Sequence, residues 1–106
     1  MGAVLEKGGC LPGAFVADND LIALGAVRAM KRQGLRVPED YSVMGFDDVP
    51  LCILSDPVLT SMAVPRKALG ELAVRRLVER MRGEAGPPVK TVVPTALQMR
   101  QSVKRK

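Results

Sequence analysis

The feature that most constrains the fold is a short apolar run, an amphipathic helix and a second apolar run that follow one another with short links. Residues 14–18 (AFVAD) are too few for a helix and predict a buried strand. Residues 21–33 predict a helix that Asn19 or Asp20 can cap, and residues 41–46 predict a second buried strand. Two strands joined by a helix form a βαβ unit, so we expect the strands to be parallel. The expected fold class is therefore α/β.

The first predicted helix has an apolar face and an internal glycine. The residues expected to face the sheet are Ile22, Ala26, Ala29, Met30 and Gln33. Gly25 costs about 1 kcal/mol relative to alanine inside a helix, so we expect it to permit close packing on the sheet. Gly34 is expected to end the helix.

The second half of the chain predicts more strands and a longer helix. Residues 58–64 predict a third strand, and Pro65 opens an amphipathic helix that Gly83 ends. The buried stripe of this helix is expected at Leu69, Leu72, Ala73, Leu77 and Met81. Further strands are predicted near residues 89–93 and 96–99. This order of elements favours a Rossmann-like parallel sheet with flanking helices.

Several kinds of enzyme are excluded by composition. The 106 residues contain no histidine, which removes His-based general-base catalysis, catalytic triads and the common zinc sites. The two cysteines, Cys10 and Cys52, are far apart in the chain and are expected to be inert. Asp47 and Asp48 are adjacent, so in extended chain they point to opposite faces and cannot form a facing catalytic pair. We expect no enzymatic activity, no metal site and no cofactor.

The net charge of +5 raises the question of nucleic acid binding. The basic residues concentrate on the second predicted helix and in the tail, at Arg75, Arg76, Arg80, Arg82, Arg100, Lys104, Arg105 and Lys106. A solvated helix face and a solvated terminus explain them, and no aromatic residues lie between them for base stacking. No run approaches the ~20 apolar residues of a membrane helix, and the N-terminus does not resemble a signal peptide. We expect a cytoplasmic chain that contacts neither DNA nor membrane directly.

Polar residues follow both strands of the βαβ unit. Asp18, Asn19 and Asp20 follow the first strand, and Asp47 and Asp48 follow the second. Ligands of open α/β sheets bind beyond the carboxyl ends of the parallel strands, so Asn19 and Asp47 are expected on one rim. An amide and a carboxylate suit a ligand rich in hydroxyl or ring N–H groups. The alternative is that Asn19 caps its helix and Asp47 a turn, without any ligand.

Over residues 11–101, the chain resembles the C-terminal part of the LacI/GalR family of transcription regulators. The matching motifs are ND at 19–20, ALGA at 23–26, GLRVPED at 34–40, SVMGFDD at 42–48, LT at 59–60, Pro65 and LG at 69–70. No single motif is specific, but the set is. The resemblance implies a periplasmic-binding-protein-like fold, in which two α/β lobes flank a cleft.

The resemblance also implies a function in effector sensing and dimerisation. It implies that Asn19 and Asp47 contact a small effector, either a sugar or a nucleobase-like molecule, and that the effector controls DNA binding allosterically. Possible further members of the ligand rim are Asp18, Asp20 and Asp48. The apolar residues that the resemblance places in a homodimer interface are Leu51, Cys52, Ile53 and Leu54.

By its resemblance, the chain is expected to be a fragment. Residues 1–64 and about 95–102 would belong to the C-terminal lobe, and about 65–94 to the N-terminal lobe. The DNA-binding headpiece of the family is not present, so DNA is expected as a partner only through such a headpiece. Val64 stands where many members have glutamine, which removes one expected ligand contact. The alternative function is that of a solute-binding protein of the same fold that serves transport.

Overall fold

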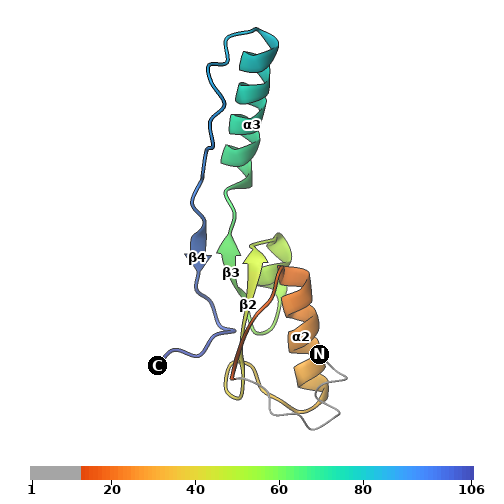
Figure 1. Ribbon diagram of the computed structural model, residues 1–106. Coiled ribbons are helices and arrows are strands. Elements are labelled where there is room, and N and C mark those ends of the chain that lie inside the picture. The colour runs from red at the N-terminus through yellow and green to blue at the C-terminus, as the bar shows by residue number, and fades with distance from the viewer. Residues whose placement is uncertain (1–12) are drawn as a thin grey trace. The chain divides into compact units, whose positions relative to one another are not determined.

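A four-stranded sheet forms the centre of the fold. The computed structural model describes residues 13–106. The strands lie in the order β1 (Ala14–Val16), β2 (Ser42–Asp47), β3 (Thr60–Ala63) and β4 (Ala96–Gln98), and Figure 1 shows the last three side by side. The first three strands are parallel, and β4 runs antiparallel to β3. The predicted α/β class and the parallel βαβ unit are confirmed.

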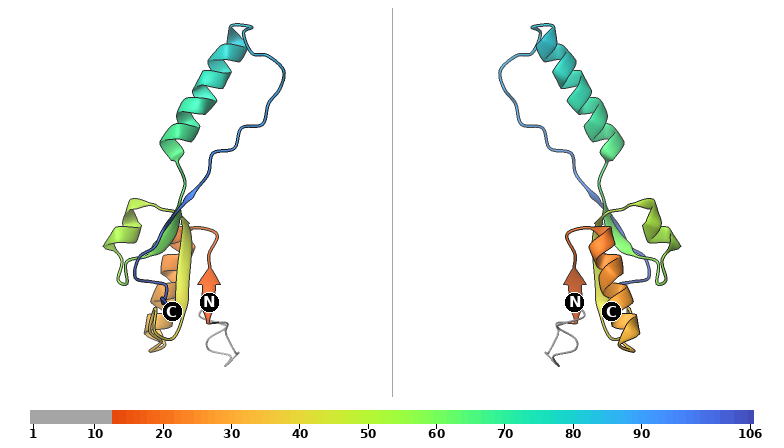
Figure 2. Two further views of the ribbon diagram at one scale, coloured as in Figure 1. Left: turned by 90° about the vertical axis from the view of Figure 1, so that its left-hand side faces the viewer. Right: turned by 90° about the vertical axis from the view of Figure 1, so that its right-hand side faces the viewer.

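Helix α2 (Asp20–Arg32) connects β1 to β2 and packs against β2, as both views of Figure 2 show. Its buried apolar side chains contribute to a core made of Ala23, Val27, Met30, Val37, Val43, Cys52 and Leu59. Burying an aliphatic side chain of this size stabilises the fold by about 1.5–3 kcal/mol. The core therefore fixes α2 and β2 relative to each other, and with them the chain segments that follow β1 and β2.

The face that α2 turns toward the sheet agrees with the predicted one only in part: Ala26 and Met30 are buried as expected. Ile22 is 53% exposed, and Gln33 is exposed beyond the end of the helix. A Cβ atom built on Gly25 would have no neighbour within 4 Å, so this glycine does not serve close packing. The buried face runs instead through Asp20 and the residues three, six, seven and ten positions later, which lie on one side of the helix.

The strand predicted near residues 89–93 is not formed, whereas β4 lies within the predicted range 96–99. A strand requires a neighbour that accepts and donates its backbone hydrogen bonds. Among residues 13–106, no strand lies beside residues 89–93. The β-branched residues of this segment favour a strand locally, but a strand does not form because no neighbouring strand is available to pair with it.

The chain divides into two compact units. Of the described residues, 13–63 and Ala96–Lys106 form the first unit, and Val64–Thr95 form the second. The second unit consists of helix α3 (Arg66–Met81) and the segment after it. No residue of α3 is buried, and Leu77 and Met81 are 58% and 78% exposed. The predicted stripe on α3 is thus apolar but not buried by the described residues, and the assignment of this unit to another lobe stays a prediction.

Candidate ligand-binding site

Asn19 and Asp47 follow neighbouring parallel strands at the same edge of the sheet. The register of β1 and β2 pairs Val16 with Met44. Asn19 lies three residues beyond Val16, and Asp47 lies three residues beyond Met44. Both positions therefore lie at the carboxyl ends of the strands, where open α/β sheets bind ligands. Their joint contact with one ligand stays a prediction.

Only one side-chain atom of Asn19, its Oδ1, forms a hydrogen bond with helix α2. Asn19 Oδ1 accepts a hydrogen bond of 2.9 Å from the backbone N–H of Ile22, which makes Asn19 the N-cap of the helix. No hydrogen bond within residues 13–106 uses its amide nitrogen. Asn19 can therefore cap the helix and still offer two N–H donors to a ligand. The neighbouring Asp18 is exposed.

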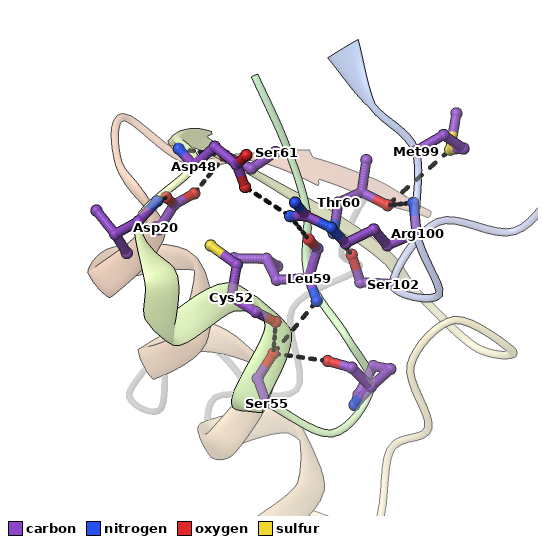
Figure 3. Close-up of polar contacts among 12 residues, drawn as sticks. Asp20, Asp48, Cys52, Ser55, Leu59, Thr60, Ser61, Met99, Arg100 and Ser102 are labelled. Carbon is purple, nitrogen blue, oxygen red and sulfur yellow. Dashed lines mark hydrogen bonds and ion pairs between the residues drawn. The ribbon is translucent and has the colours of Figure 1, made fainter. Parts of the chain in front are cut away.

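Strand β2 ends in a backbone conformation that is rare for residues with side chains. The φ angle is 101° at Asp47 and 54° at Asp48. Such angles cost about 1–3 kcal/mol each and persist only where the surroundings hold them. The N–H of Asp48 donates to Ser61 Oγ at 3.1 Å, and the N–H of Val49 donates to Asp20 Oδ2 at 2.8 Å (Figure 3). Groups on β3 and α2 thus hold the turn that carries Asp47.

Asp20 is part of this support and not of the exposed rim. It is 1% exposed, and its Oδ1 accepts a hydrogen bond of 2.5 Å from Ser61 Oγ. Gly45 leaves room for it, because a Cβ atom at that position would overlap with Asp20 Oδ1. Burial raises the pKa of the Cys52 thiol to about 11, and the hydrogen bond with Asp20 acts in the same direction. We therefore leave Asp20 out of the proposed ligand rim.

Asp48 forms an ion pair with Arg100, a contact that no local sequence pattern predicts. Arg100 Nη1 lies 2.7 Å from Asp48 Oδ1 and 2.8 Å from the carbonyl oxygen of Leu59. The side chains of Arg100 and Asp48 are only 19% and 21% exposed. The hydrogen bond to Asp48 raises the pKa of Arg100. In the sequence, Arg100 belongs to a basic tail, and the two partners are 52 positions apart.

The predicted dimer residues lie on η1 (Pro50–Leu54), a short 3₁₀ helix that follows β2. Leu51, Ile53 and Leu54 are 47%, 60% and 78% exposed, whereas Cys52 is fully buried in the core. Three of the four residues can thus contact a second chain directly. Cys52 instead anchors η1 to the first unit.

The second unit contains a hollow of about 370 Å³ between α3 and the segment that follows it. The residues that line it include Leu69, Leu72, Arg76, Arg80, Val89 and Val93. None of the predicted site residues contributes to this lining. The hollow is therefore separate from the candidate site on the first unit.

Residues 13–106 contain neither a candidate metal-binding cluster nor a membrane-spanning helix. No group of three or more histidine, cysteine, aspartate or glutamate residues in this range could hold a metal ion. None of the helices in the same range has the length and apolar character to cross a membrane.

The sequence matches the family described as periplasmic binding protein-like domain over residues 2–103. The lactose operon repressor of Rhizobium radiobacter is 39% identical over 94 residues, which cover 89% of this chain and 82% of that protein. The chain belongs to the LacI/GalR family. The family predicted from the motifs, and the fold that it implied, are confirmed.

Other family members are longer than this chain. The transcriptional regulator MalR of Streptomyces coelicolor is 45% identical over 89 residues, which cover 84% of this chain and 26% of that protein. The chain spans about a quarter of the length of the first curated relatives it matches. These relatives are transcriptional regulators and not enzymes.

Solved structures of the family agree with the fold of this chain. A LacI-type regulator from Bifidobacterium animalis matches 97% of it with a TM-score of 0.88 and 32% identity, using 36% of that chain. A dimeric Lac repressor matches 96% with a TM-score of 0.86 and 36% identity, using 37% of that chain. A complex of the regulator CelR with cellobiose matches 85% with a TM-score of 0.82 and 39% identity, using 28% of that chain.

Proposed function

We propose that this chain is the effector-binding and dimerisation part of a cytoplasmic transcriptional regulator of the LacI type. In this proposal, Asn19 and Asp47 bind a small sugar at the carboxyl edge of the sheet, with Asp18 and Asp48 beside them. Binding there changes DNA affinity allosterically through a headpiece of the kind that such regulators carry, and not through residues 13–106. Residues 65–94 would form part of the other lobe that flanks the ligand.

The observation that carries the proposal is the register of β1 and β2. It brings Asn19 and Asp47 to the ends of neighbouring strands, three residues beyond the pair Val16 and Met44. The turn at Asp47 is held by two part-buried hydrogen bonds to Ser61 and Asp20, and these two side chains share a buried hydrogen bond. A prearranged carboxylate loses little conformational entropy on binding, which favours affinity.

The chemistry of the two side chains favours a sugar. A carboxylate accepts hydrogen bonds from two adjacent hydroxyl groups, and an amide N–H donates to a hydroxyl or ring oxygen. CelR, which is similar to this chain, has been solved with cellobiose, and the Rhizobium relative is named for the lactose operon. We therefore choose cellobiose and lactose as first probes. A nucleoside that binds at the same residues in place of both would replace the sugar in this proposal.

Two substitutions at the rim are expected to weaken sugar binding by about 30-fold each, because each removes a hydrogen bond worth about 1.5–3 kcal/mol to a charged or buried group. Asp47→Asn keeps a side chain that tolerates positive φ but loses the charge. Asn19→Ser keeps the N-cap of α2 but loses the amide donors. Isothermal titration of the chain with cellobiose and with lactose measures both effects.

The control for these variants is Glu39→Gln, an exposed carboxylate that precedes β2 and so lies at the opposite edge of the sheet. Its affinity for the probe should equal that of the wild type. If neither sugar nor any nucleoside binds the wild-type chain, the proposed function is wrong. If Asp47→Asn binds as tightly as the wild type, the ligand lies elsewhere.

We further propose that η1 mediates homodimerisation. Leu51, Ile53 and Leu54 present apolar surface that the first unit does not cover. Burying such side chains between two chains gains about 1.5–3 kcal/mol each before the costs of association. A structure similar to this chain, that of the Lac repressor, is described as dimeric.

The double substitution Leu51→Asp/Leu54→Asp is expected to raise the dimer dissociation constant at least about tenfold, because two carboxylates would have to lose water in an apolar interface. Sedimentation equilibrium measures the constant. Val92→Asp, a 76% exposed valine in the second unit, is the matched control. A wild-type chain that remains monomeric at roughly tens of micromolar would end the proposal. Dissociation caused by Val92→Asp instead would move the interface to the second unit.

A further inference from the structure

The turn at the end of β2 needs support from outside its own segment. Asp47 and Asp48 both have positive φ angles, a conformation that side-chain-bearing residues rarely adopt. Two backbone hydrogen bonds support the turn at Asp48 and Val49, through Ser61 and Asp20. Both are donated by backbone N–H groups, so neither holds the side chain of Asp48. The Asp48 side chain is held by Arg100.

One side-chain nitrogen of Arg100 connects the segment that carries Arg100 to both Asp48 and Leu59. Its Nη1 donates to Asp48 Oδ1 at 2.7 Å and to the carbonyl oxygen of Leu59 at 2.8 Å (Figure 3). Its backbone N–H donates to Thr60 Oγ1 at 2.9 Å, which fixes the position of Arg100 against β3. The side chain is 19% exposed, so water screens the ion pair less than it would at the surface.

The segment that carries Arg100 is anchored to the sheet by Ser102. Ser102, two residues later, is fully buried, and its Oγ joins the backbones of Val43 and Thr60. Arg100 is thus hydrogen-bonded to β3 through its own backbone. It also lies two residues before Ser102, which bridges β2 and β3. A guanidinium held in this way can restrain a carboxylate at a turn that would otherwise relax.

We propose that Arg100 is a positioning residue for the ligand site, which acts through Asp48 to hold the turn that presents Asp47 at the carboxyl edge of the sheet. The proposal rests on the function proposed above. Arg100 need not touch the ligand in this role. Its loss should change the local conformation at Asp48 and Val49 and, through it, the affinity of the site.

The first test is independent of any ligand. Arg100→Met removes the charge and keeps the length of the side chain. Amide hydrogen exchange measured by NMR should become about tenfold faster at Asp48 and Val49, because a hydrogen bond to a charged group that restrains the turn is lost. The N–H of Leu35, which donates to the carbonyl of Met30, should exchange at the wild-type rate.

Two further variants separate positioning from a general loss of stability. Arg100→Lys offers one nitrogen with several donors and, because Nη1 alone makes both side-chain contacts, should keep exchange within about twofold of the wild type. Arg36→Met is the matched control. It removes an arginine paired with Asp40 at 2.9 Å, a contact that lowers the pKa of Asp40 to about 2, and should leave the turn unchanged.

The second test measures affinity for cellobiose, or for lactose if only lactose binds. Arg100→Met should weaken binding about tenfold, which corresponds to about 1.4 kcal/mol, and Arg100→Lys should restore most of it. Asp48→Asn should cause a similar loss, and the double variant should lose no more than the larger of the two single losses, since both substitutions remove the ion pair between Asp48 and Arg100.

The outcomes distinguish the two proposals. A folded Arg100→Met chain with wild-type exchange at Asp48 and Val49 overturns the positioning role. Equal losses of affinity in Arg100→Met and Arg100→Lys also overturn it, because the ion pair would then not be the cause. If the wild-type chain binds neither sugar, the proposed function fails, and the exchange rates alone decide whether Arg100 positions the turn.

Discussion

Replacement of Gly45 with alanine is expected to lower the free energy of unfolding by about 4 kcal/mol. The new Cβ atom would overlap with Asp20 Oδ1 and would lie 3.1 Å from both Asp20 Cα and Leu59 Cδ2. Overpacking of this kind costs about 1–3 kcal/mol. Displacing the Asp20 carboxylate would also break its hydrogen bond with Ser61, and hydrogen bonds to charged groups contribute about 1.5–3 kcal/mol.

Urea denaturation followed by circular dichroism measures this change, and Gly25→Ala is its matched control. Gly25 lies inside α2 with open space around the position of a Cβ atom. Alanine there should stabilise the protein by up to about 1 kcal/mol, because it is the better helix former. The two glycine substitutions should thus have opposite signs. The steric argument would be contradicted if the free energy of unfolding of Gly45→Ala lay within about 1 kcal/mol of the wild-type value. The expected loss exceeds the error of extrapolating urea data to water.

These two glycines show what the sequence could and could not predict about α2. The range of the helix and its N-cap were predictable, because Asn19 and the apolar spacing are local signals. The inward face was predictable only in part, because Ala26 and Met30 are buried as expected but Asp20 was expected at the helix cap or on the ligand rim. Asp20 is buried instead, with hydrogen bonds to Ser61 and Val49, which lie 41 and 29 positions later. The effect expected for Gly45→Ala could not be predicted either, because it depends on the buried position of Asp20 beside Gly45.

The candidate site also combines local and long-range features of the sequence. The position of Asn19 and Asp47 at one edge of the sheet could be predicted, because each follows an apolar strand of a βαβ unit and the carboxyl ends of parallel strands meet at one edge. The support of Asp47 could not be predicted. Arg100 and Ser102 lie in a segment that reads as a charged, polar tail, and only the fold brings them to β2 and β3.

Replacement of Ser102 with alanine is expected to lower the free energy of unfolding by about 3 kcal/mol. Ser102 is fully buried, and its Oγ donates to the carbonyl of Val43 at 2.6 Å and accepts from the N–H of Thr60 at 2.8 Å. Alanine would leave both backbone groups without a partner where water does not reach, and each such loss costs about 1–3 kcal/mol. Urea denaturation measures the loss, and amide exchange at Thr60 should become faster.

Ser42→Ala is the matched control for this substitution, because Ser42 lies on the same strand as Val43 and its Oγ accepts only a surface hydrogen bond of 3.0 Å from the N–H of Lys104. Its effect should stay within about 0.5 kcal/mol. Equal effects of the two serine substitutions would contradict a special role of Ser102. If the prediction holds, Ser102 joins β2 and β3 through hydrogen bonds to Val43 and Thr60, at the end of the sheet where the pairing of these two strands begins. Arg100, two residues before Ser102, then reaches the turn at Asp48 from a fixed position, and the geometry of the proposed ligand edge depends on residues 100–102.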